Sequence, residues 1–237
     1  MNLQHLFDLE CHRPLAVLAV RDGHERAQLA PALEAGIGLI EVRIDEFGEC
    51  GISVVRSYLE SFSGLPLLGT IRAAREGGGW KDSEAARLAL YEAIIPHVDL
   101  IDIELSATEI LDEVVELAHA AGRRVIGSYH DFEATPEDGR LEALLAGAAQ
   151  CQADLFKVAA KCNTPGDLRR LAAFTACHSG EFPLAVMGMG PYGALSRIFF
   201  GALGSRLTYT FLGRPTAPGQ IACDETLALL SRFYPAG

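Results

Sequence analysis

Short apolar runs recur along the chain, and more polar segments separate them. Eight such runs can be read from the sequence, at residues 14–20, 37–43, 65–71, 98–104, 124–130, 153–159, 183–187 and 207–211. Each run is too short for a buried helix and too continuously apolar for a strand with one face in water. This pattern is typical of parallel strands that are covered on both faces.

The segments between these runs predict amphipathic helices, with apolar residues at helical spacing over 24–36, 83–94, 107–122 and 166–178. Gly36 and Gly122 stand where helices commonly end, because glycine adopts the left-handed conformation without a steric penalty. Eight strands alternating with eight helices, at about 30 residues a unit, predict a single (β/α)8 barrel (TIM barrel) domain over residues 1–237. A doubly wound open sheet is the second interpretation, but the count of eight and the absence of a break in composition favour the barrel.

Composition and charge narrow the classes of partner. The chain has 20 Lys and Arg against 31 Asp and Glu, a net charge of −11, which argues against a nucleic-acid surface and against anionic lipid. The six cysteines form no Cys-x-x-Cys pair, and the first residues lack the features of a signal peptide, so we expect a reduced, cytoplasmic protein. The most apolar stretch, 182–204, is interrupted by Gly, Pro and Arg, and no membrane segment is expected.

Reactive side chains gather at the carboxyl ends of the predicted strands. They are Glu41, Arg43, Asp45, Thr70, Arg72, Asp102, Glu104, Ser128, His130, Asp131, Lys157, Met187 and Met189. In a barrel these ends meet at one mouth, where enzymes of this fold carry out their chemistry. The sequence therefore predicts an active site at that mouth.

Lys157 is one of three lysines in the chain and lies inside the apolar run ADLFKVA. It either pairs with a carboxylate across the barrel or serves as a nucleophile, because a partly desolvated amine near other cations has a lowered pKa and can form a Schiff base. His130 ends the neighbouring strand, either as a hydrogen-bonded structural residue or as a proton shuttle for that amine. Glu76, in the glycine-rich segment REGGGW, is a candidate partner of His130 if this loop folds over the mouth instead of remaining a flexible surface loop.

Residues 182–223 contain no Asp or Glu but three arginines. This local positive charge suggests a site for a small anion, in which Arg197, near the start of the seventh helix, clamps a carboxylate. Arg206 and Arg214 are expected to be exposed. The segment GMGPYG at 188–193 fits G-x-G-x-x-G, but no acidic residue follows about 20 residues later, which argues against a dinucleotide site.

Metal-ligand patterns are weak in this chain. There is no His-x-His or His-Glu-x-x-His, and no cysteine has the spacing of a zinc ligand, so no metal site is expected. Asp102 and Glu104 could hold magnesium, but they could equally be hydrogen-bond partners of the basic residues at the mouth.

Several segments together resemble the type I 3-dehydroquinate dehydratases. From Glu41 to Gln220 they follow in the order EVRID, GTIRAAREGG, IDIEL, SYHDFEATP, DLFKVA, MGMG, GALSRIFFGALGS and TAPGQI. The most specific are SYHDF, FKVA and APGQ. The resemblance implies a (β/α)8 barrel that removes water from 3-dehydroquinate to give 3-dehydroshikimate, in the shikimate pathway, without metal or organic cofactor. A homodimer is the assembly that we expect.

The resemblance also implies roles for individual residues. Lys157 forms the imine with the substrate ketone, His130 acts as general acid and base, and Glu76 orients and charges His130. The substrate contacts that the family pattern implies are Glu41, Arg43, Arg72, Met187, Met189, Arg197, Thr216 and Gln220.

Two positions depart from the family pattern. Thr216 replaces a common Ser, which could change how its loop closes, and Tyr209 replaces a frequent Phe, which puts an apolar lid contact there in doubt. Two other functions stay open, a class I aldolase that cleaves a C–C bond and a non-catalytic barrel that binds a small carboxylate. The SYHDF and APGQ segments argue against the first, and the intact set of Lys157, His130 and Glu76 argues against the second.

Overall fold

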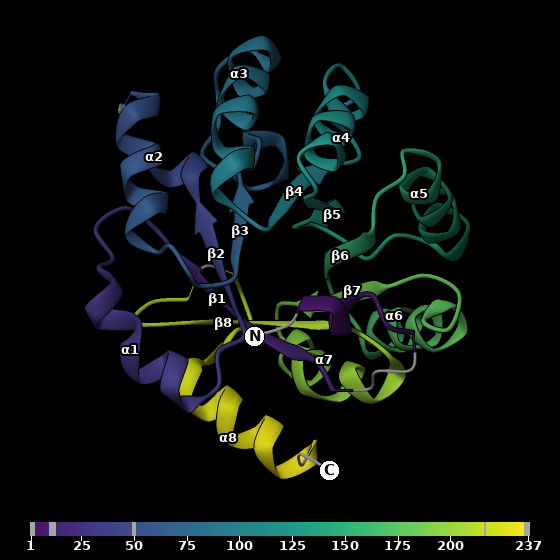
Figure 1. Cartoon of the computed structure of the whole chain (residues 1–237). Helices are drawn as coiled ribbons and strands as arrows, with labels where there is room; N and C mark the ends of the chain where they lie inside the picture. Colours follow the sequence, from purple (N-terminus) through teal and green to yellow (C-terminus); the bar gives the residue numbers. More distant parts are fainter. Residues whose placement is uncertain (1–2, 10–12, 49–50, 216, 235–237) are drawn as a thin grey trace.

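The computed structural model describes residues 3–9, 13–48, 51–215 and 217–234 (Figure 1). Its parallel strands curl around one axis, and the helices lie outside them. The strands are β1 Leu15–Val20, β2 Leu39–Arg43, β3 Leu67–Thr70, β4 Leu100–Glu104, β5 Arg124–Asp131, β6 Leu155–Lys161, β7 Leu184–Met189, β8 Leu207–Phe211 and the short β9 Ile221–Ala222. Each of the eight predicted strands is confirmed.

Eight α-helices lie within the described residues and alternate with the strands. They are α1 Arg26–Ala35, α2 Ile52–Ser61, α3 Glu84–Ile94, α4 Leu111–Ala120, α5 Asp138–Gln150, α6 Pro165–His178, α7 Gly193–Phe199 and α8 Cys223–Phe233. Short 3-10 helices are also present, at η1 Leu3–Leu6, η2 Ile44–Glu46, η3 Ala74–Glu76, η4 Ile95–His97 and η5 Phe200–Leu203. Gly36 ends α1 in the left-handed conformation, at φ 117°, as the sequence predicts.

The strand order identifies the fold as a barrel. Hydrogen-bonded neighbours run β7-β6-β5-β4-β3-β2-β1-β8-β9, all in parallel. Neighbours along the chain are neighbours in the sheet, with no reversal of direction such as a doubly wound sheet has. The open-sheet interpretation is therefore wrong.

The barrel closes between β7 and the residues that precede β8. Leu184 and Ser205 form a β-bridge, and the backbone N–H of Arg206 donates to the carbonyl of Leu184 at 2.7 Å. The buried hydroxyl of Ser205 contacts β7 two residues beyond Leu184. It accepts a hydrogen bond from the N–H of Val186 at 3.0 Å and donates one to the carbonyl of the same residue at 3.3 Å. A side chain thus takes the place of two backbone hydrogen bonds at this seam.

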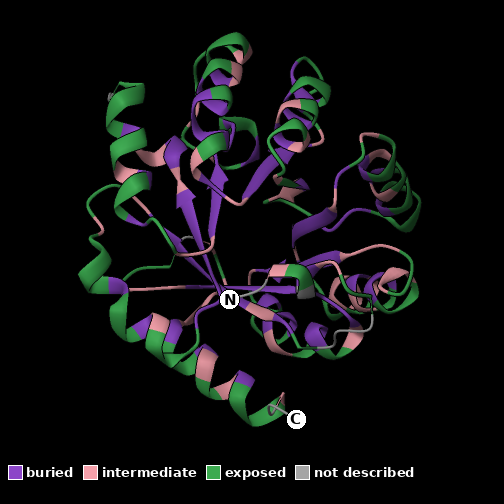
Figure 2. Ribbon diagram, viewed as in Figure 1, coloured by how far each residue is buried: buried purple, intermediate pink, exposed green. Residues whose placement is uncertain are grey.

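Apolar layers fill both faces of the sheet. The barrel interior opposite the mouth is packed by successive strands through Val17, Leu39, Leu68, Leu100, Ile126 and Leu155. A second apolar layer lies between strands and helices, and Figure 2 shows buried strands surrounded by helices whose outer faces are exposed. The interior is a packed core rather than a channel, so it supports the residues above it.

Arg206 corrects one expectation from the sequence. Alternation along β8 turns Leu207 and Tyr209 inward, so the preceding Arg206 lies on the other face, which the helices cover. Arg206 is therefore only 2% exposed rather than solvent-facing, whereas Arg214 is exposed as expected. None of the helices in the described ranges combines the length and apolar character that a bilayer crossing requires.

Candidate active site

The polar residues of the mouth stand directly above the packed interior. Along β4, the inward-facing Leu100 is followed two residues later by Asp102 and four residues later by Glu104, because alternate residues of a strand share one face. The same step from apolar to polar occurs on β2, from Leu39 to Glu41. Strands β2 and β4 therefore each present an apolar base and a reactive tip.

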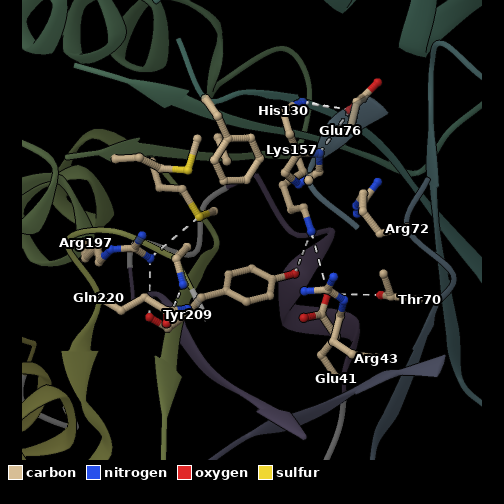
Figure 3. A pocket seen from close by; sticks show the side chains of 16 residues that line it. Glu41, Arg43, Thr70, Arg72, Glu76, His130, Lys157, Arg197, Tyr209 and Gln220 are labelled. Atoms are coloured by element: carbon tan, nitrogen blue, oxygen red, sulfur yellow. Dashed lines mark hydrogen bonds and ion pairs between the residues drawn. The ribbon is translucent and has the colours of Figure 1, made fainter. Parts of the chain in front are cut away.

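Side chains at this end of the barrel enclose a pocket of about 570 Å³, including the part that opens to solvent. Figure 3 shows side chains from several strands pointing into it. The predicted site residues that line it are Glu41, Arg43, Arg72, Glu76, His130, Lys157, Met187, Met189, Arg197 and Gln220. Thr216, the remaining predicted contact, lies outside the described residues. The structure thus gathers the predicted set at one place, and the role of each residue stays a prediction.

Lys157 is held at the floor of the pocket by three oxygen atoms. Its side chain is only 4% exposed, and Nζ lies 2.5 Å from Asp102 Oδ2 and 3.7 Å from Glu41 Oε1. Nζ also donates a hydrogen bond to the hydroxyl of Tyr209 at 3.2 Å. Lys157 is therefore paired with carboxylates, as one of the two interpretations of the sequence expected, and it also lines the pocket.

Asp102 is fully buried and shared between two cations. Arg72 Nη2 lies 2.5 Å from Asp102 Oδ1, on the opposite oxygen from Lys157. Burial alone would raise the pKa of Asp102, but the charges of Arg72 and Lys157 outweigh it and hold the pKa well below its usual range. Asp102 is therefore a permanent carboxylate behind the lysine.

Glu104, the second carboxylate considered as a magnesium ligand, is paired with two arginines. Its oxygens lie 3.1 Å from Arg72 Nη1 and 3.0 Å from Arg87 Nη2, and one of them accepts the N–H of Ala73 at 2.7 Å. Within the described ranges, no group of three His, Cys, Asp or Glu residues is arranged to hold a metal ion. Sequence reasoning missed Arg87, whose signal was a basic residue on an otherwise apolar helix face.

His130 is fixed by a carboxylate from the loop after β3. Glu76 Oε2 lies 3.1 Å from His130 Nδ1 and also accepts the backbone N–H of His130 at 2.9 Å, while Ser106 donates to Glu76 Oε1 at 2.5 Å. A carboxylate only accepts hydrogen bonds, so Nδ1 carries the proton and Nε2 is the basic nitrogen of the neutral ring.

Burial, together with the positive charges of Arg72 and Lys157, lowers the pKa of His130 well below its ordinary value. Burial also raises the pKa of Glu76, although the Ser106 hydrogen bond and Arg72 oppose the change. These surroundings favour the neutral imidazole, which is the form that a general base requires.

Glycines bring Glu76 to this position. The N–H of Gly79 donates to Asp45 Oδ2 at 2.9 Å, and a Cβ on Gly79 would lie 2.1 Å from the carbonyl oxygen of Asp45. A Cβ on Gly78 would lie 2.0 Å from the carbonyl oxygen of Arg72. The loop therefore packs against the mouth instead of extending into solvent, as its glycine content predicts.

Arg197 forms the opposite side of the pocket. It lies in the last turn of the short helix α7, not near its start as expected, because this helix begins only at Gly193. The guanidinium is buried, and it donates to the carbonyl oxygens of Gly219 at 3.0 Å and Tyr209 at 3.4 Å. Within the described part of the chain no carboxylate lies within 4 Å of it, and burial lowers the pKa of Arg197 to about 10. A buried cation without a nearby negative charge favours the binding of an anion.

Neighbours of Arg197 complete this side. Met187 and Met189 are buried in the barrel interior and line the pocket. Gln220 is held by the loop that follows β8, because its Oε1 accepts the N–H of Ala217 at 3.1 Å. In Figure 3 Arg197 and Gln220 lie on one side of the pocket, with His130, Glu76 and Arg72 on the other.

The glycines of 188–193 have a packing role. A Cβ on Gly193 would lie 2.5 Å from the carbonyl oxygen of Gly188, and the N–H of Gly188 donates to Ser196 Oγ at 2.8 Å. The segment therefore fits α7 closely onto β7. This contact accounts for the glycine pattern without a dinucleotide.

Comparison of the sequence with known proteins identifies one family. The family model for type I 3-dehydroquinase matches residues 15–234. A 3-dehydroquinate dehydratase of Aquifex aeolicus is 33% identical over 222 residues, which cover 93% of this chain and 99% of that protein. The corresponding protein of Klebsiella pneumoniae is 36% identical over 204 residues, 80% of each chain.

Solved structures agree with the sequence matches. The crystal structure of the Aquifex aeolicus dehydratase has a TM-score of 0.84 and 32% identity, and the match covers 94% of this chain and 100% of that one. The 3-dehydroquinate dehydratase of Geobacillus kaustophilus has a TM-score of 0.83 and 30% identity, with 94% and 93% covered.

Proposed function

Because the chain belongs to the type I 3-dehydroquinase family, we propose that Lys157, His130 and Arg197 divide the dehydration of 3-dehydroquinate among them. The chain is a lyase that removes water from 3-dehydroquinate to give 3-dehydroshikimate in the shikimate pathway, by the Schiff-base chemistry of the type I enzymes. One observation carries the division of roles. An amine, an imidazole of fixed tautomer and a buried guanidinium without a carboxylate partner line the same pocket.

Lys157 supplies the nucleophile. Its amine attacks the ketone carbon, and loss of the ketone oxygen as water leaves a protonated imine. The imine withdraws electrons from the adjacent carbon, so a C–H bond on that carbon becomes acidic. The position of Nζ above the apolar interior, against Asp102, supports this role because it leaves the amine at one defined point of the pocket.

His130 moves the protons of the elimination. Its basic Nε2 removes the proton from the carbon beside the imine, and the protonated ring then gives that proton to the departing hydroxyl. The hydrogen bond from Nδ1 to Glu76 keeps the required tautomer and stabilises the imidazolium formed between the two steps. Glu76 acts through His130, so we assign it an orienting role.

Arg197 binds the substrate carboxylate. A carboxylate brought next to this guanidinium supplies the negative charge that its surroundings lack, and the charge-assisted pair holds the ring toward Lys157. Gln220 donates and accepts hydrogen bonds at the same side, and Met187 with Met189 forms an apolar surface for the ring. Glu41, Arg43 and Arg72 face the substrate hydroxyl groups from the other strands.

Three further expectations accompany this proposal. We propose that residues 1–237 form one domain, which the single continuous sheet of the described residues supports. The homodimer and the cytoplasmic location stay predictions. Light scattering of the purified protein and fractionation of the cells that produce it test them.

Borohydride trapping tests the proposed nucleophile. Borohydride added with 3-dehydroshikimate reduces an imine to a stable amine, so we expect loss of activity and one adduct, located on Lys157 by peptide mapping. Lys161→Arg is the matched control, because it removes the other lysine of β6 and retains its charge. An adduct on Lys161 or Lys81, or full activity without any adduct, would reject the assignment.

A further inference from the structure

Tyr209 connects the two sides of the pocket. Its side chain is buried on β8, and its hydroxyl accepts the hydrogen bond from Lys157 Nζ at 3.2 Å. Nζ also lies 4.7 Å from the centroid of the Tyr209 ring. The carbonyl oxygen of the same residue accepts from Arg197. Figure 3 shows the ring between these two partners, with the hydroxyl directed at the amine.

The three oxygens near Nζ differ in what they can do. Asp102 is a fully buried carboxylate, outside the lining of the pocket, and its low pKa leaves it able only to accept. Glu41 Oε1 lies farther away, at 3.7 Å, and already accepts a hydrogen bond from Thr70 at 3.0 Å. The hydroxyl of Tyr209 lines the pocket, contacts Nζ directly, and can accept a proton while it donates another.

The surroundings of Tyr209 also keep its proton in place. Burial raises the pKa of Tyr209 well above its ordinary value, and the negative charges of Glu41 and Asp102 add to this change. The group beside the amine is thus a neutral hydroxyl rather than a phenolate.

Imine formation needs a path for two protons between nitrogen and oxygen. The ammonium of a lysine carries three hydrogens, of which one remains on the nitrogen of the protonated imine. The ketone oxygen leaves as water, which contains two hydrogens. The net change therefore moves two protons from nitrogen to oxygen, with no net exchange with solvent.

We propose that the hydroxyl of Tyr209 is this path. As the N–C bond forms, the hydroxyl takes one proton from Nζ and gives its own proton to the ketone oxygen, which produces the carbinolamine with two hydrogens and the positive charge still on its nitrogen. A second transfer in the same direction accompanies the breaking of the C–O bond, so water leaves and the hydroxyl ends protonated. Hydrolysis of the product imine follows the reverse course. The proton transfers of the elimination step remain assigned to His130.

The geometry supports this route because the ketone oxygen of the bound substrate is only two bonds from Nζ once the N–C bond forms. A hydroxyl in hydrogen-bond contact with Nζ on the pocket side is then next to that oxygen. The inference rests on the proposed function in one respect, which is that Lys157 forms the imine.

The test uses the product, since 3-dehydroshikimate forms an imine without any elimination. Wild type and Tyr209→Phe are mixed rapidly with 3-dehydroshikimate and borohydride, and the adduct on Lys157 is followed by mass spectrometry over a range of product concentrations. Tyr129→Phe is the matched control, because it also removes a hydrogen-bonded tyrosine hydroxyl, which donates to Asp131, but Tyr129 does not line the pocket.

We expect Tyr209→Phe to lower the limiting rate of adduct formation on the order of 100-fold, the scale of a lost general acid–base group. The half-saturating product concentration should stay unchanged, and Tyr129→Phe should behave as wild type. A wild-type limiting rate in Tyr209→Phe overturns the relay, and so does a variant in which only the half-saturating concentration rises. If the wild-type adduct is not on Lys157, the proposed nucleophile fails first, and that result is distinct from either of these.

Discussion

Arg72 and Arg197 line opposite sides of one pocket, and each is 4% exposed, yet their surroundings are opposite in character. Arg72 contacts the carboxylates of Asp102 and Glu104. Within the described residues, the hydrogen bonds of the Arg197 guanidinium go to carbonyl oxygens and to the sulfur of Met187. Equal burial therefore leads to two different electrostatic states.

The direction of the pKa changes expresses the difference. Burial would lower the pKa of Arg72, but the neighbouring carboxylates outweigh it and raise the pKa well above its ordinary value. For Arg197 burial acts without compensation and lowers the pKa to about 10. A neutralised cation is part of the framework, whereas an unneutralised one favours an incoming anion.

The comparison assigns separate tasks to the two halves of the barrel. Strands β3 to β6 and the loop after β3 contribute the paired charges around Lys157 and His130, to which we assign the bond-breaking steps. The segment from β7 to β9 contributes Arg197, to which we assign the binding of the substrate carboxylate. Apart from Tyr209, whose hydroxyl contacts Lys157 from β8, substitutions on one side should therefore leave the task of the other side intact.

The largest expected effect is on the reacting side, at His130. His130→Ala removes the general base and acid, so we expect kcat to fall by about 10²- to 10⁴-fold. Lys157 remains able to attack the ketone, and borohydride should still trap an adduct on it. Enone absorbance measures turnover, and mass spectrometry measures the adduct. Near-normal turnover would move the proton shuttle to another group at the mouth, with Glu41 the next candidate.

An intermediate effect concerns the stability of the two arginine sites. Arg72→Met leaves Glu104 and Asp102 with fewer cations in the core, and we expect the free energy of unfolding to fall by about 3–5 kcal/mol. Arg197→Met, of matched volume, removes a charge that has no counter-ion and should change the free energy of unfolding by less than about 1 kcal/mol. Urea denaturation of both variants measures the difference. Equal losses would show that Arg197 is as much a part of the framework as Arg72.

Much of this arrangement could be predicted from the sequence. The strands were predictable because parallel strands covered on both faces are continuously apolar, and the inward polar tips follow from alternation, as in Leu100, Asp102 and Glu104. Lys157 stood out because a charge inside an apolar run requires a partner or a function.

The features that the sequence did not predict depend on contacts between segments that are distant along the chain. Tyr209 is 52 residues from Lys157 in sequence, and nothing local in the chain indicates that its hydroxyl meets the amine. The family pattern drew attention to Tyr209 only as a departure. The burial of Arg206 also escaped prediction, because it results from the helices that cover the outer face of the barrel, on which Arg206 lies.

The most direct test of the division between the two sides is the product dependence of borohydride trapping in Arg197→Met. If Arg197 binds and Lys157 reacts, the half-saturating concentration of 3-dehydroshikimate should rise roughly 10- to 150-fold, equivalent to about 1.5–3 kcal/mol for a charge-assisted pair. The adduct at saturation should still form on Lys157 at nearly the wild-type limiting rate. An unchanged half-saturating concentration, or a limiting rate that collapses while binding is unaltered, would contradict the account.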